Sequence, residues 1–347
     1  MLRIGSSLID RDESKVFFIA EIGINHNGDV ELAKRLIDIA SAAGADAVKF
    51  QKRSVEDSFT AERLEKPYLT KNSWGKTYGK HKHHLELSMK QYRELIDYAH
   101  KVGLLFGCTP CDHPSVEFLY QLGVDFYKCA SGDLRNIPLL RDIASRGIPM
   151  IISTGMSSMR DVYAIHKMLK GCEAQFAILS CTSTYPTPME DVNLNVIKSY
   201  LECFPQTVIG YSGHELGYIP TVAAVALGAR IIERHITIDR TMRGSDHIAS
   251  LDPEQLDVVV KGVRDLEKAL GSRVKRIRES EKPFMEKLCK SVVLARDVKE
   301  GEVLDEKMLC VKHPGTGVSP LCWDSLIGRR VLVSLKRDQV LLEEHFE

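Results

Sequence analysis

The chain has 347 residues, in which 47 lysines and arginines balance 47 aspartates and glutamates. A chain without net charge has no long-range field that would hold nucleic acid or an anionic membrane, so small anions must be bound by local clusters of positive side chains. The length is too great for one ordinary hydrophobic core and fits one large domain followed by a small one.

Nine cysteines are scattered through apolar segments, and no apolar run approaches the roughly 20 residues that a membrane span needs. The N-terminus lacks the charged segment, apolar core and cleavage site of a secretory signal. We therefore expect a cytoplasmic protein with reduced thiols, and neither nucleic acid nor a membrane as a partner. The segment Cys108-Thr109-Pro110-Cys111 has redox spacing, but the absence of a second pair favours ordinary thiols.

Residues 16 to 271 alternate compact apolar runs with longer segments in which apolar residues recur at helical spacing. Asp252 and Pro253 are suited to begin the last of these helices, and Gly271 is suited to end it. The predicted strands are 16–20, 47–50, 104–107, 126–129, 150–153, 176–180, 208–211 and 230–233. Eight strand-then-helix units predict an α/β fold, the (β/α)8 TIM barrel. A doubly wound open sheet is the alternative, but no Gly-x-Gly-x-x-Gly turn follows the first strand.

The C-terminal part of the chain is predicted to be a separate, β-rich module. Residues 272 to 290 are rich in charge and contain Pro283, which indicates a partly helical linker. Beyond it, 291–295, 308–311 and 330–335 are predicted strands. The predicted domains are therefore 1–280 and 281–347. Because about 60 residues bury little apolar surface, we expect the module to pack on its own barrel or on a partner's.

Active sites of such barrels lie at the C-terminal ends of the strands, and these ends are unusually polar here. Lys49 and Lys128 stand inside apolar strands, where a lysine is costly unless it is paired. An anionic ligand could pair them, helped by neighbouring hydroxyls and backbone amides that suit a phosphate and a carboxylate. The alternatives are an internal ion pair with Glu21 or Glu233, or a lysine that forms a Schiff base.

Two histidines, His214 and His235, each follow a β-branched apolar run on consecutive strands. Neighbouring strand ends share one rim of a parallel barrel, so both imidazoles could reach one divalent cation, with water or substrate as the remaining ligands. Each could instead be a satisfied core residue. The run Lys80-His81-Lys82-His83-His84 is interpreted as a solvated face or as a contact to a substrate anion.

The chain resembles a known family, the sialic acid synthases, through motifs that occur in the family's order. These are IAEIGINHNGD, AVKFQK, SWGKTYGKHKHHLELS, YKCASGD, STGM, CTSTYP, IGYSGHE, ERHIT and GSDH. The resemblance implies condensation of phosphoenolpyruvate with an N-acylmannosamine or its 6-phosphate, giving N-acetylneuraminate or its 9-phosphate. It leaves open the related nonulosonates KDN, legionaminate and pseudaminate. It also implies a TIM barrel followed by an antifreeze-like (SAF) domain, and a domain-swapped homodimer in which that domain covers the partner's active site.

The resemblance also implies a role for individual residues. His214 and His235 would hold Mn²⁺ or Mg²⁺. The residues implied to bind phosphoenolpyruvate are Lys49, Thr109, Lys128, Ser131, Ser153 and Ser212. Those implied to orient the sugar and move protons are Glu21, Gln51, Tyr185, Glu233 and Asp246. Within these two sets, the expected catalytic residues are Glu21, Lys49, Lys128, Glu233 and Asp246.

One position departs from the family pattern. Bacterial members usually carry an arginine before the Pro-Gly of the antifreeze-like domain, where it reaches the other subunit's sugar, and here that position is His313. The segment SWGKTYGKHKHHLELS resembles the animal-type enzymes that take the 6-phosphate, and Lys76, Lys80 and Lys82 add cations that a neutral sugar would not require. Two other classes stay open: a Schiff-base aldolase with Lys128 as nucleophile, and a non-catalytic sugar-binding protein.

Overall fold

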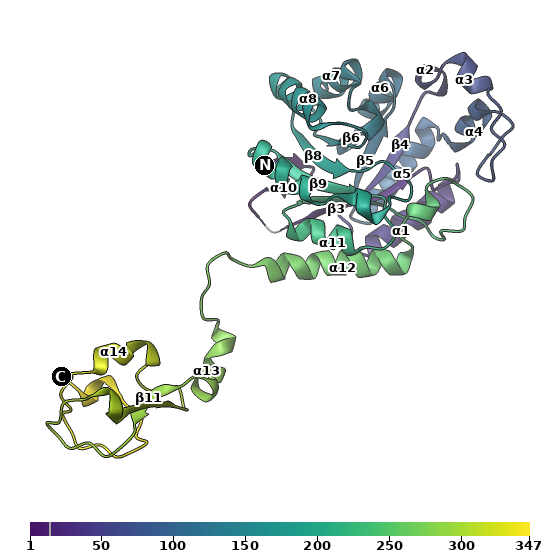
Figure 1. Cartoon of the computed structure of the whole chain (residues 1–347). Helices are drawn as coiled ribbons and strands as arrows, with labels where there is room; N and C mark the ends of the chain where they lie inside the picture. Colours follow the sequence, from purple (N-terminus) through teal and green to yellow (C-terminus); the bar gives the residue numbers. More distant parts are fainter. Residues whose placement is uncertain (14) are drawn as a thin grey trace. The chain divides into compact units, whose positions relative to one another are not determined.

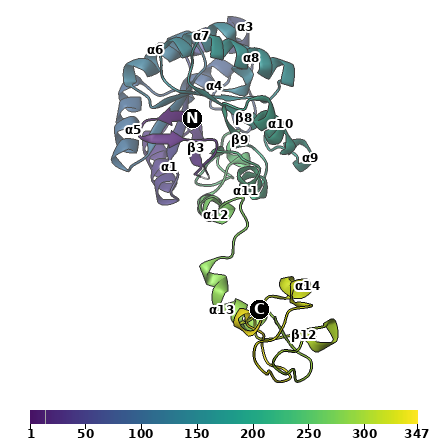
Figure 2. The same ribbon diagram turned by 90° about the vertical axis from the view of Figure 1, so that its left-hand side faces the viewer.

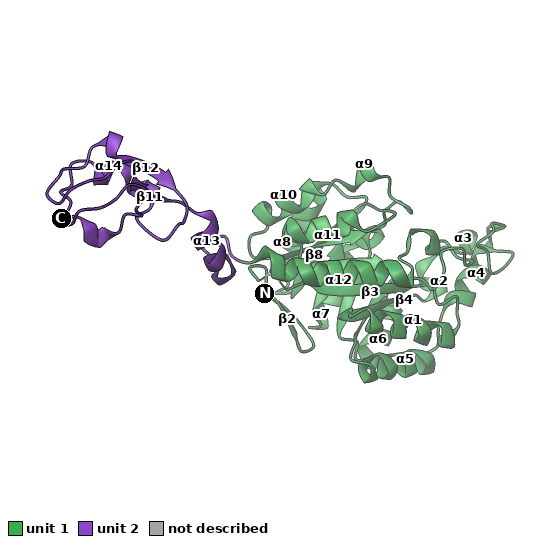
Figure 3. Cartoon of the chain, turned by 90° about the horizontal axis from the view of Figure 1, so that it is seen from below, with its two compact units in different colours: residues 1–271 green, residues 272–347 purple. Residues whose placement is uncertain are grey.

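The computed structural model describes residues 1–13 and 15–347. Two compact units make up the chain, Met1–Gly271 and Ser272–Glu347 (Figure 3). Among the described residues, no helix is long and apolar enough to cross a membrane. Cys108 and Cys111 are both free thiols.

Eight parallel strands of the first unit close into a barrel, in the order β10-β3-β4-β5-β6-β7-β8-β9 (Figure 1). The strands are β3 Phe17–Gly23, β4 Ala47–Lys52, β5 Leu105–Pro110, β6 Phe126–Cys129, β7 Met150–Ser153, β8 Phe176–Cys181, β9 Val208–Gly213 and β10 Ile231–His235. All eight predicted strands are confirmed, and closure of the barrel excludes the open sheet. Several strands run two or three residues beyond the apolar segment that predicted them. The barrel ladder therefore carries polar residues at its C-terminal end.

A ring of helices surrounds the barrel (Figure 1). Its main members are α1 Val30–Ala42, α5 Met89–Lys101, α6 His113–Leu122, α7 Ile137–Ser145, α8 Met159–Gly171, α10 Asn195–Cys203, α11 Ile219–Ala226 and α12 Pro253–Leu270. Their apolar faces pack on the outer side of the strands and form the largest core. Helix α12 begins as predicted, with the Asp252 side chain accepting a hydrogen bond from the backbone N–H of Gln255 at 3.0 Å.

A short hairpin that the sequence did not predict closes the N-terminal end of the barrel (Figure 2). It consists of β1 Leu2–Ile4 and β2 Ser7–Ile9, paired antiparallel. Its apolar side chains pack with the first residues of the barrel strands, such as Phe17 and Ala47. Strands of three residues are too short to show a periodic pattern. Because this end is filled with apolar side chains, a ligand has access only from the other end.

Between β4 and α5 the chain makes a long excursion over the rim, with α2 Val55–Ser58, α3 Ala61–Glu65 and α4 Tyr78–Leu85. Helix α4 carries the run of lysines and histidines that was interpreted as a solvated face or as a contact to a substrate anion. The solvated-face interpretation holds for only part of the run. His83 is exposed, whereas His81 is buried and Lys82 lines the main cavity of the barrel.

The second unit has a small core of its own, built around residues such as Val292 and Leu326. Its elements include α13 Lys282–Leu288, β11 Ser291–Leu294, β12 Leu309–Lys312 and α14 Trp323–Leu326. The partly helical linker and the first two predicted strands are confirmed. The strand predicted at 330–335 is wrong. Its residues make isolated bridges to three separate segments, so no continuous ladder forms.

Candidate active site

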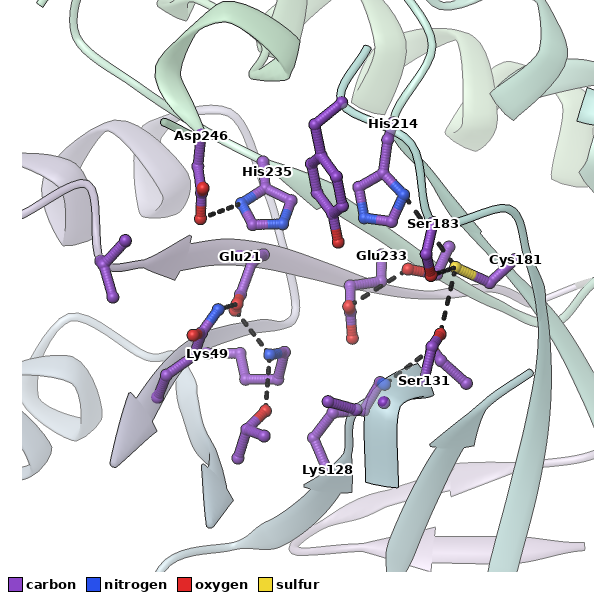
Figure 4. A pocket seen from close by; sticks show the side chains of 18 of the residues that line it. Glu21, Lys49, Lys128, Ser131, Cys181, Ser183, His214, Glu233, His235 and Asp246 are labelled. Atoms are coloured by element: carbon purple, nitrogen blue, oxygen red, sulfur yellow. Dashed lines mark hydrogen bonds and ion pairs between the residues drawn. The ribbon is translucent and has the colours of Figure 1, made fainter. Parts of the chain in front are cut away.

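A cavity of about 440 Å³ opens at the C-terminal ends of the barrel strands (Figure 4). The predicted site residues of the barrel all line it: Glu21, Lys49, Gln51, Thr109, Lys128, Ser131, Ser153, Tyr185, Ser212, His214, Glu233, His235 and Asp246. His313 belongs to the second unit, where it is exposed and donates a hydrogen bond from Nδ1 to the Cys289 carbonyl at 2.9 Å. The barrel residues predicted from the sequence therefore all lie around one polar cavity.

Lys49 is held in an internal ion pair. Its Nζ lies 2.8 Å from Glu21 Oε2, and both side chains are almost fully buried. Lys49 also donates to Thr109 Oγ1 at 2.9 Å, while Gln51 donates to the other Glu21 oxygen at 3.0 Å. The alternative of an internal Lys–Glu pair is thus correct for this lysine. The network fixes the Lys49 ammonium at the floor of the cavity.

Lys128 lies in a different environment. Its Nζ donates to the Ser153 hydroxyl at 2.7 Å and to the Cys129 carbonyl at 2.8 Å, both of which are neutral. In the part of the chain that the structure describes, no carboxylate forms an ion pair with it, although only 2% of its surface is exposed. The nearby Glu233 carboxylate, whose pKa Lys128 helps to lower, makes no direct ion pair with it, so the ammonium keeps a donor that could contact an anionic ligand.

A backbone hydrogen bond orders the hydroxyl of Ser131, another residue that lines the cavity. Gly155 N–H donates to Ser131 Oγ at 3.0 Å, which joins the end of β7 to the turn after β6. A Cβ at Gly155 would collide with the Ser183 hydroxyl, so only glycine fits there. The side chains of Ser131 and Lys128 lie on the same side of the cavity (Figure 4).

The two histidines face each other across the rim, with ring centroids 5.4 Å apart. His214 Nδ1 lies 3.0 Å from the Thr182 carbonyl, which can only accept, so Nδ1 carries a proton. Burial acts to lower the pKa of His214, but Cys181 and the Thr182 carbonyl outweigh it and raise that pKa above the ordinary value. The Nδ1 atom of His235 is buried without a hydrogen-bond partner among the described residues, and it lies 4.0 Å from Asp246 Oδ2. Burial, in spite of the nearby Asp246, lowers the pKa of His235 to about 4, so its imidazole is neutral near pH 7.

The environments of two carboxylates differ. Burial raises the pKa of Glu21 in spite of the nearby Lys49. Burial also acts to raise the pKa of Glu233, but Lys128 and Lys49 outweigh it, so that its pKa falls below the ordinary value. Ser212 donates to one oxygen of Glu233 at 3.3 Å, and the other oxygen is buried without a hydrogen-bond partner in the described chain. Divergent pKa values of neighbouring carboxyls are typical of acid–base sites.

A second, fully buried ion pair holds the histidine-bearing segments together. Arg234 Nη1 lies 2.8 Å from Glu215 Oε1, and its Nη2 donates to the Glu215 carbonyl at the same distance. Tyr211 donates to the other carboxylate oxygen at 2.7 Å. Glu215 follows His214 and Arg234 precedes His235, so the pair connects the two histidines through their neighbours.

The sequence analysis did not predict Arg53 as a cavity residue, and it did not distinguish Lys82 from the other lysines of its segment. Arg53 is 7% exposed, donates to Gln51 at 3.0 Å, and is paired only loosely with Glu86, at 3.6 Å. Alternate strand residues share a face, so the series Lys49, Gln51, Arg53 carried a signal for it. Of the three lysines assigned to the sugar from sequence, Lys82 lines this cavity, whereas Lys76 and Lys80 are exposed outside it.

Residues 36–275 match the NeuB family, and residues 290–347 match the SAF domain. The chain belongs to the NeuB family. It is 49% identical to human N-acetylneuraminate-9-phosphate synthase over 329 residues, covering 94% of this chain and 92% of that protein. It is 37% identical to the N,N'-diacetyllegionaminic acid synthase of Campylobacter jejuni over 333 residues, 95% of this chain and 99% of that one.

Solved structures agree with the NeuB assignment. The N-acetylneuraminic acid synthetase of Leptospira borgpetersenii superposes with a TM-score of 0.72 at 33% identity, over 82% of this chain and 95% of that one. The protein is therefore an enzyme of the sialic acid synthase type, with a TIM barrel followed by a SAF domain. The expected family and fold are both confirmed.

Proposed function

We propose that this NeuB-family enzyme condenses phosphoenolpyruvate with an N-acylmannosamine or its 6-phosphate, giving N-acetylneuraminate or its 9-phosphate and inorganic phosphate. The observation that carries the proposal is one cavity in which a histidine pair faces the buried Lys128 cation. The first group suits a carbonyl-activating metal and the second suits an anion. The human and mouse relatives named as N-acetylneuraminate-9-phosphate synthases support this choice of product.

The residues at the rim fit a divalent cation. Nε2 of His214, once unprotonated, and the buried, unpartnered Nδ1 of His235 would be the two nitrogen ligands. Because Mn²⁺ and Mg²⁺ prefer oxygen ligands to imidazole, water or substrate oxygens would have to complete the site. The Thr182 carbonyl fixes the His214 tautomer, as outer partners of metal-binding histidines commonly do. A bound cation would supply Lewis-acid polarisation of the sugar's aldehyde oxygen. Asp246 lies 4.0 Å from His235, but among the described residues no three His, Cys, Asp or Glu side chains are arranged to hold a metal, so the two histidines would be the protein's ligands.

The opposite side of the cavity fits phosphoenolpyruvate. Lys128 offers its unpaired positive charge, and the hydroxyls of Ser131 and Ser153 add polar contacts. Lys49 sits beside them but is already neutralised by Glu21. Among these groups Lys128 therefore contributes the largest net attraction for the substrate's phosphate or carboxylate. Its neutral surroundings favour an anion clamp over the Schiff-base alternative.

In the proposed reaction, carbon 3 of phosphoenolpyruvate forms a bond to the aldehyde carbon of the open-chain sugar. Water adds at carbon 2, losing a proton, and the tetrahedral intermediate releases phosphate by cleavage of the C–O bond, leaving a ketone. The ionised Glu233 is placed to take up the water's proton and to stabilise positive charge at carbon 2. The oxygen formed from the aldehyde takes up a proton, which balances the one lost by water, while Glu21 stays ionised in its pair with Lys49.

Phosphate release tests the proposal. The enzyme is supplied with phosphoenolpyruvate and, in turn, N-acetylmannosamine, its 6-phosphate, mannose 6-phosphate and a diacetamido hexose. We expect metal-dependent phosphate release with N-acetylmannosamine or its 6-phosphate. The diacetamido sugar is included because legionaminic and pseudaminic acid synthases are among the relatives. Preference for it would replace the proposed substrate, and no release with any of the four would contradict the reaction.

We further propose that the enzyme works as a domain-swapped homodimer in the cytoplasm. The family places the residue before Pro314 over the sugar of the other subunit, and here His313 occupies that position. Because its Nδ1–H is used by the Cys289 carbonyl, its Nε2 is left as an acceptor for a substrate N–H or hydroxyl.

A further inference from the structure

A second cavity, of about 950 Å³, adjoins the active site at the rim of the barrel. Tyr185, Ser245 and Asp246 line both cavities, so the two are connected. The Asp246 carboxylate is turned toward His235 (Figure 4). A ligand that begins at the histidine pair can therefore extend past Asp246 into this outer cavity. The condensation proposed above gives the outer cavity no role.

The outer cavity is positively charged. Lys71, Arg240 and Arg243 line it, against the single carboxylate of Asp246. Within residues 1–13 and 15–347, neither Lys71 nor Arg243 forms an ion pair, and Arg240 only approaches the partly exposed Asp252 at 3.5 Å. Three cations around one hollow, with little internal neutralisation, favour an anionic ligand group there.

Arg243 is held in place without being neutralised. Its guanidinium lies over the ring of Trp74, 4.3 Å from the centroid. Trp74 in turn stacks on His84, with centroids 4.5 Å apart and ring planes 13° apart. Stacking uses the face of the guanidinium and leaves its N–H groups at the edge free to donate. The side chain is therefore ordered in advance for bidentate contact with a phosphate.

We propose that the outer cavity binds a phosphomonoester at the end of the sugar opposite its aldehyde, so that the preferred acceptor is the N-acylmannosamine 6-phosphate. This inference rests on the proposed function. In an open-chain hexose the aldehyde is carbon 1 and the ester oxygen is on carbon 6. With the aldehyde at the histidine pair, the shared strip of Tyr185, Ser245 and Asp246 directs carbon 6 toward Arg243.

The test compares kcat/KM for N-acetylmannosamine 6-phosphate and N-acetylmannosamine, with phosphoenolpyruvate saturating. Arg243→Ala should lower the value for the phosphorylated sugar roughly tenfold or more beyond any change for the unphosphorylated one, since it removes a charge-assisted contact. Arg243→Lys should recover part of the loss. The matched control is Arg63→Ala, because Arg63 also stacks on an aromatic ring at 4.3 Å, that of Tyr78, but lines neither cavity. It should leave the ratio of the two values within about twofold.

Isothermal titration calorimetry of the full-length protein with N-acetylmannosamine 6-phosphate and, separately, with N-acetylmannosamine gives the same comparison without turnover. Equal effects of Arg243→Ala on the two sugars would overturn the subsite, as would no effect on either. A wild-type enzyme that prefers the unphosphorylated sugar would also overturn it, while leaving the proposed condensation intact. Failure of the proposed function would look different, because wild-type enzyme would then release no phosphate with either sugar.

Discussion

Lys128→Met separates the binding role of this lysine from its role in the fold. The Lys128 ammonium makes two hydrogen bonds to neutral oxygens, at 2.7 and 2.8 Å, and an ammonium has three N–H donors. The third donor and the net charge are available to phosphoenolpyruvate. Loss of one charge-assisted contact of about 1.5–3 kcal/mol should raise the KM for phosphoenolpyruvate roughly tenfold to 150-fold.

The same substitution should affect folding little. Removing a buried cation relieves its desolvation cost, which is worth about 1–4 kcal/mol when an apolar side chain fills the space. Leaving the Ser153 hydroxyl and the Cys129 carbonyl without this donor costs about 1–3 kcal/mol each. These contributions oppose each other, and their midpoints, about 2.5 kcal/mol gained and about 4 kcal/mol lost, predict that the free energy of unfolding of the ligand-free protein falls by about 1.5 kcal/mol. Steady-state kinetics and denaturant unfolding measure the two quantities separately.

Lys52→Met is the matched control, on strand β4 of the same barrel. Lys52 is nearly as buried, at 13% exposure, but it is paired with Glu86 at 2.8 Å and does not line the cavity. Its loss leaves Glu86 with Arg53 as its remaining partner, so this variant should lose about 1 kcal/mol of stability and keep its KM for phosphoenolpyruvate. The reasoning is refuted if Lys128→Met keeps the wild-type KM. Labelling of Lys128 by borohydride in the presence of pyruvate would likewise replace the anion clamp with a Schiff base.

Three other outcomes are expected. Exhaustive chelation should abolish phosphate release, and added Mn²⁺ should restore it. His235→Ala should weaken Mn²⁺ binding, measured by electron paramagnetic resonance, without lowering the melting temperature. Full activity of this variant after chelation would show that the reaction needs no metal. Burial, followed by repulsion from Arg53, lowers the pKa of Lys82 to about 8. As the pH rises through that value the ammonium loses its proton, so kcat/KM for an anionic sugar should fall, whereas Lys82→Arg should hold it to roughly pH 9; an identical decline in both enzymes would assign the titration elsewhere. Mixing inactive Lys128→Ala with His313→Asp should restore activity if one subunit's SAF domain covers the other's barrel, and no recovery after confirmed subunit exchange would mean that each domain serves its own barrel.

Much of the barrel was predictable because each strand is a compact apolar run between amphipathic helices. Strand ends were less predictable, since residues such as Gln51 and His235 are polar and extend the ladder only because their neighbours do. The small unit was harder. Its residues 330–335 are apolar enough for a strand, but Val331 pairs with Phe346 while Leu335 pairs with Val298. A local pattern does not show that partners change from one residue to the next.

For the active site, the sequence predicted which side chains gather but not how their charges are shared. Both Lys49 and Lys128 appeared as buried cations in need of an anion. Only the structure shows that Glu21 satisfies the first and that the second has neutral partners. The outer cavity was not predicted, because Lys71 and Arg243 are far apart in sequence and neither lies on a strand. Long loops bring such residues together without a periodic signal.

The motifs IGYSGHE and ERHIT combine binding residues with the scaffold that holds them. Successive strand residues point to opposite sides, so His235 faces the cavity while Arg234 faces outward, where it meets Glu215. This ion pair is fully buried, and Tyr211 and Thr221 supply further hydrogen bonds to the carboxylate. A buried pair contributes little net stability but fixes geometry strongly, because either partner alone is costly. The spacing of the two imidazoles is thus set from outside the barrel, by residues that do not line the cavity.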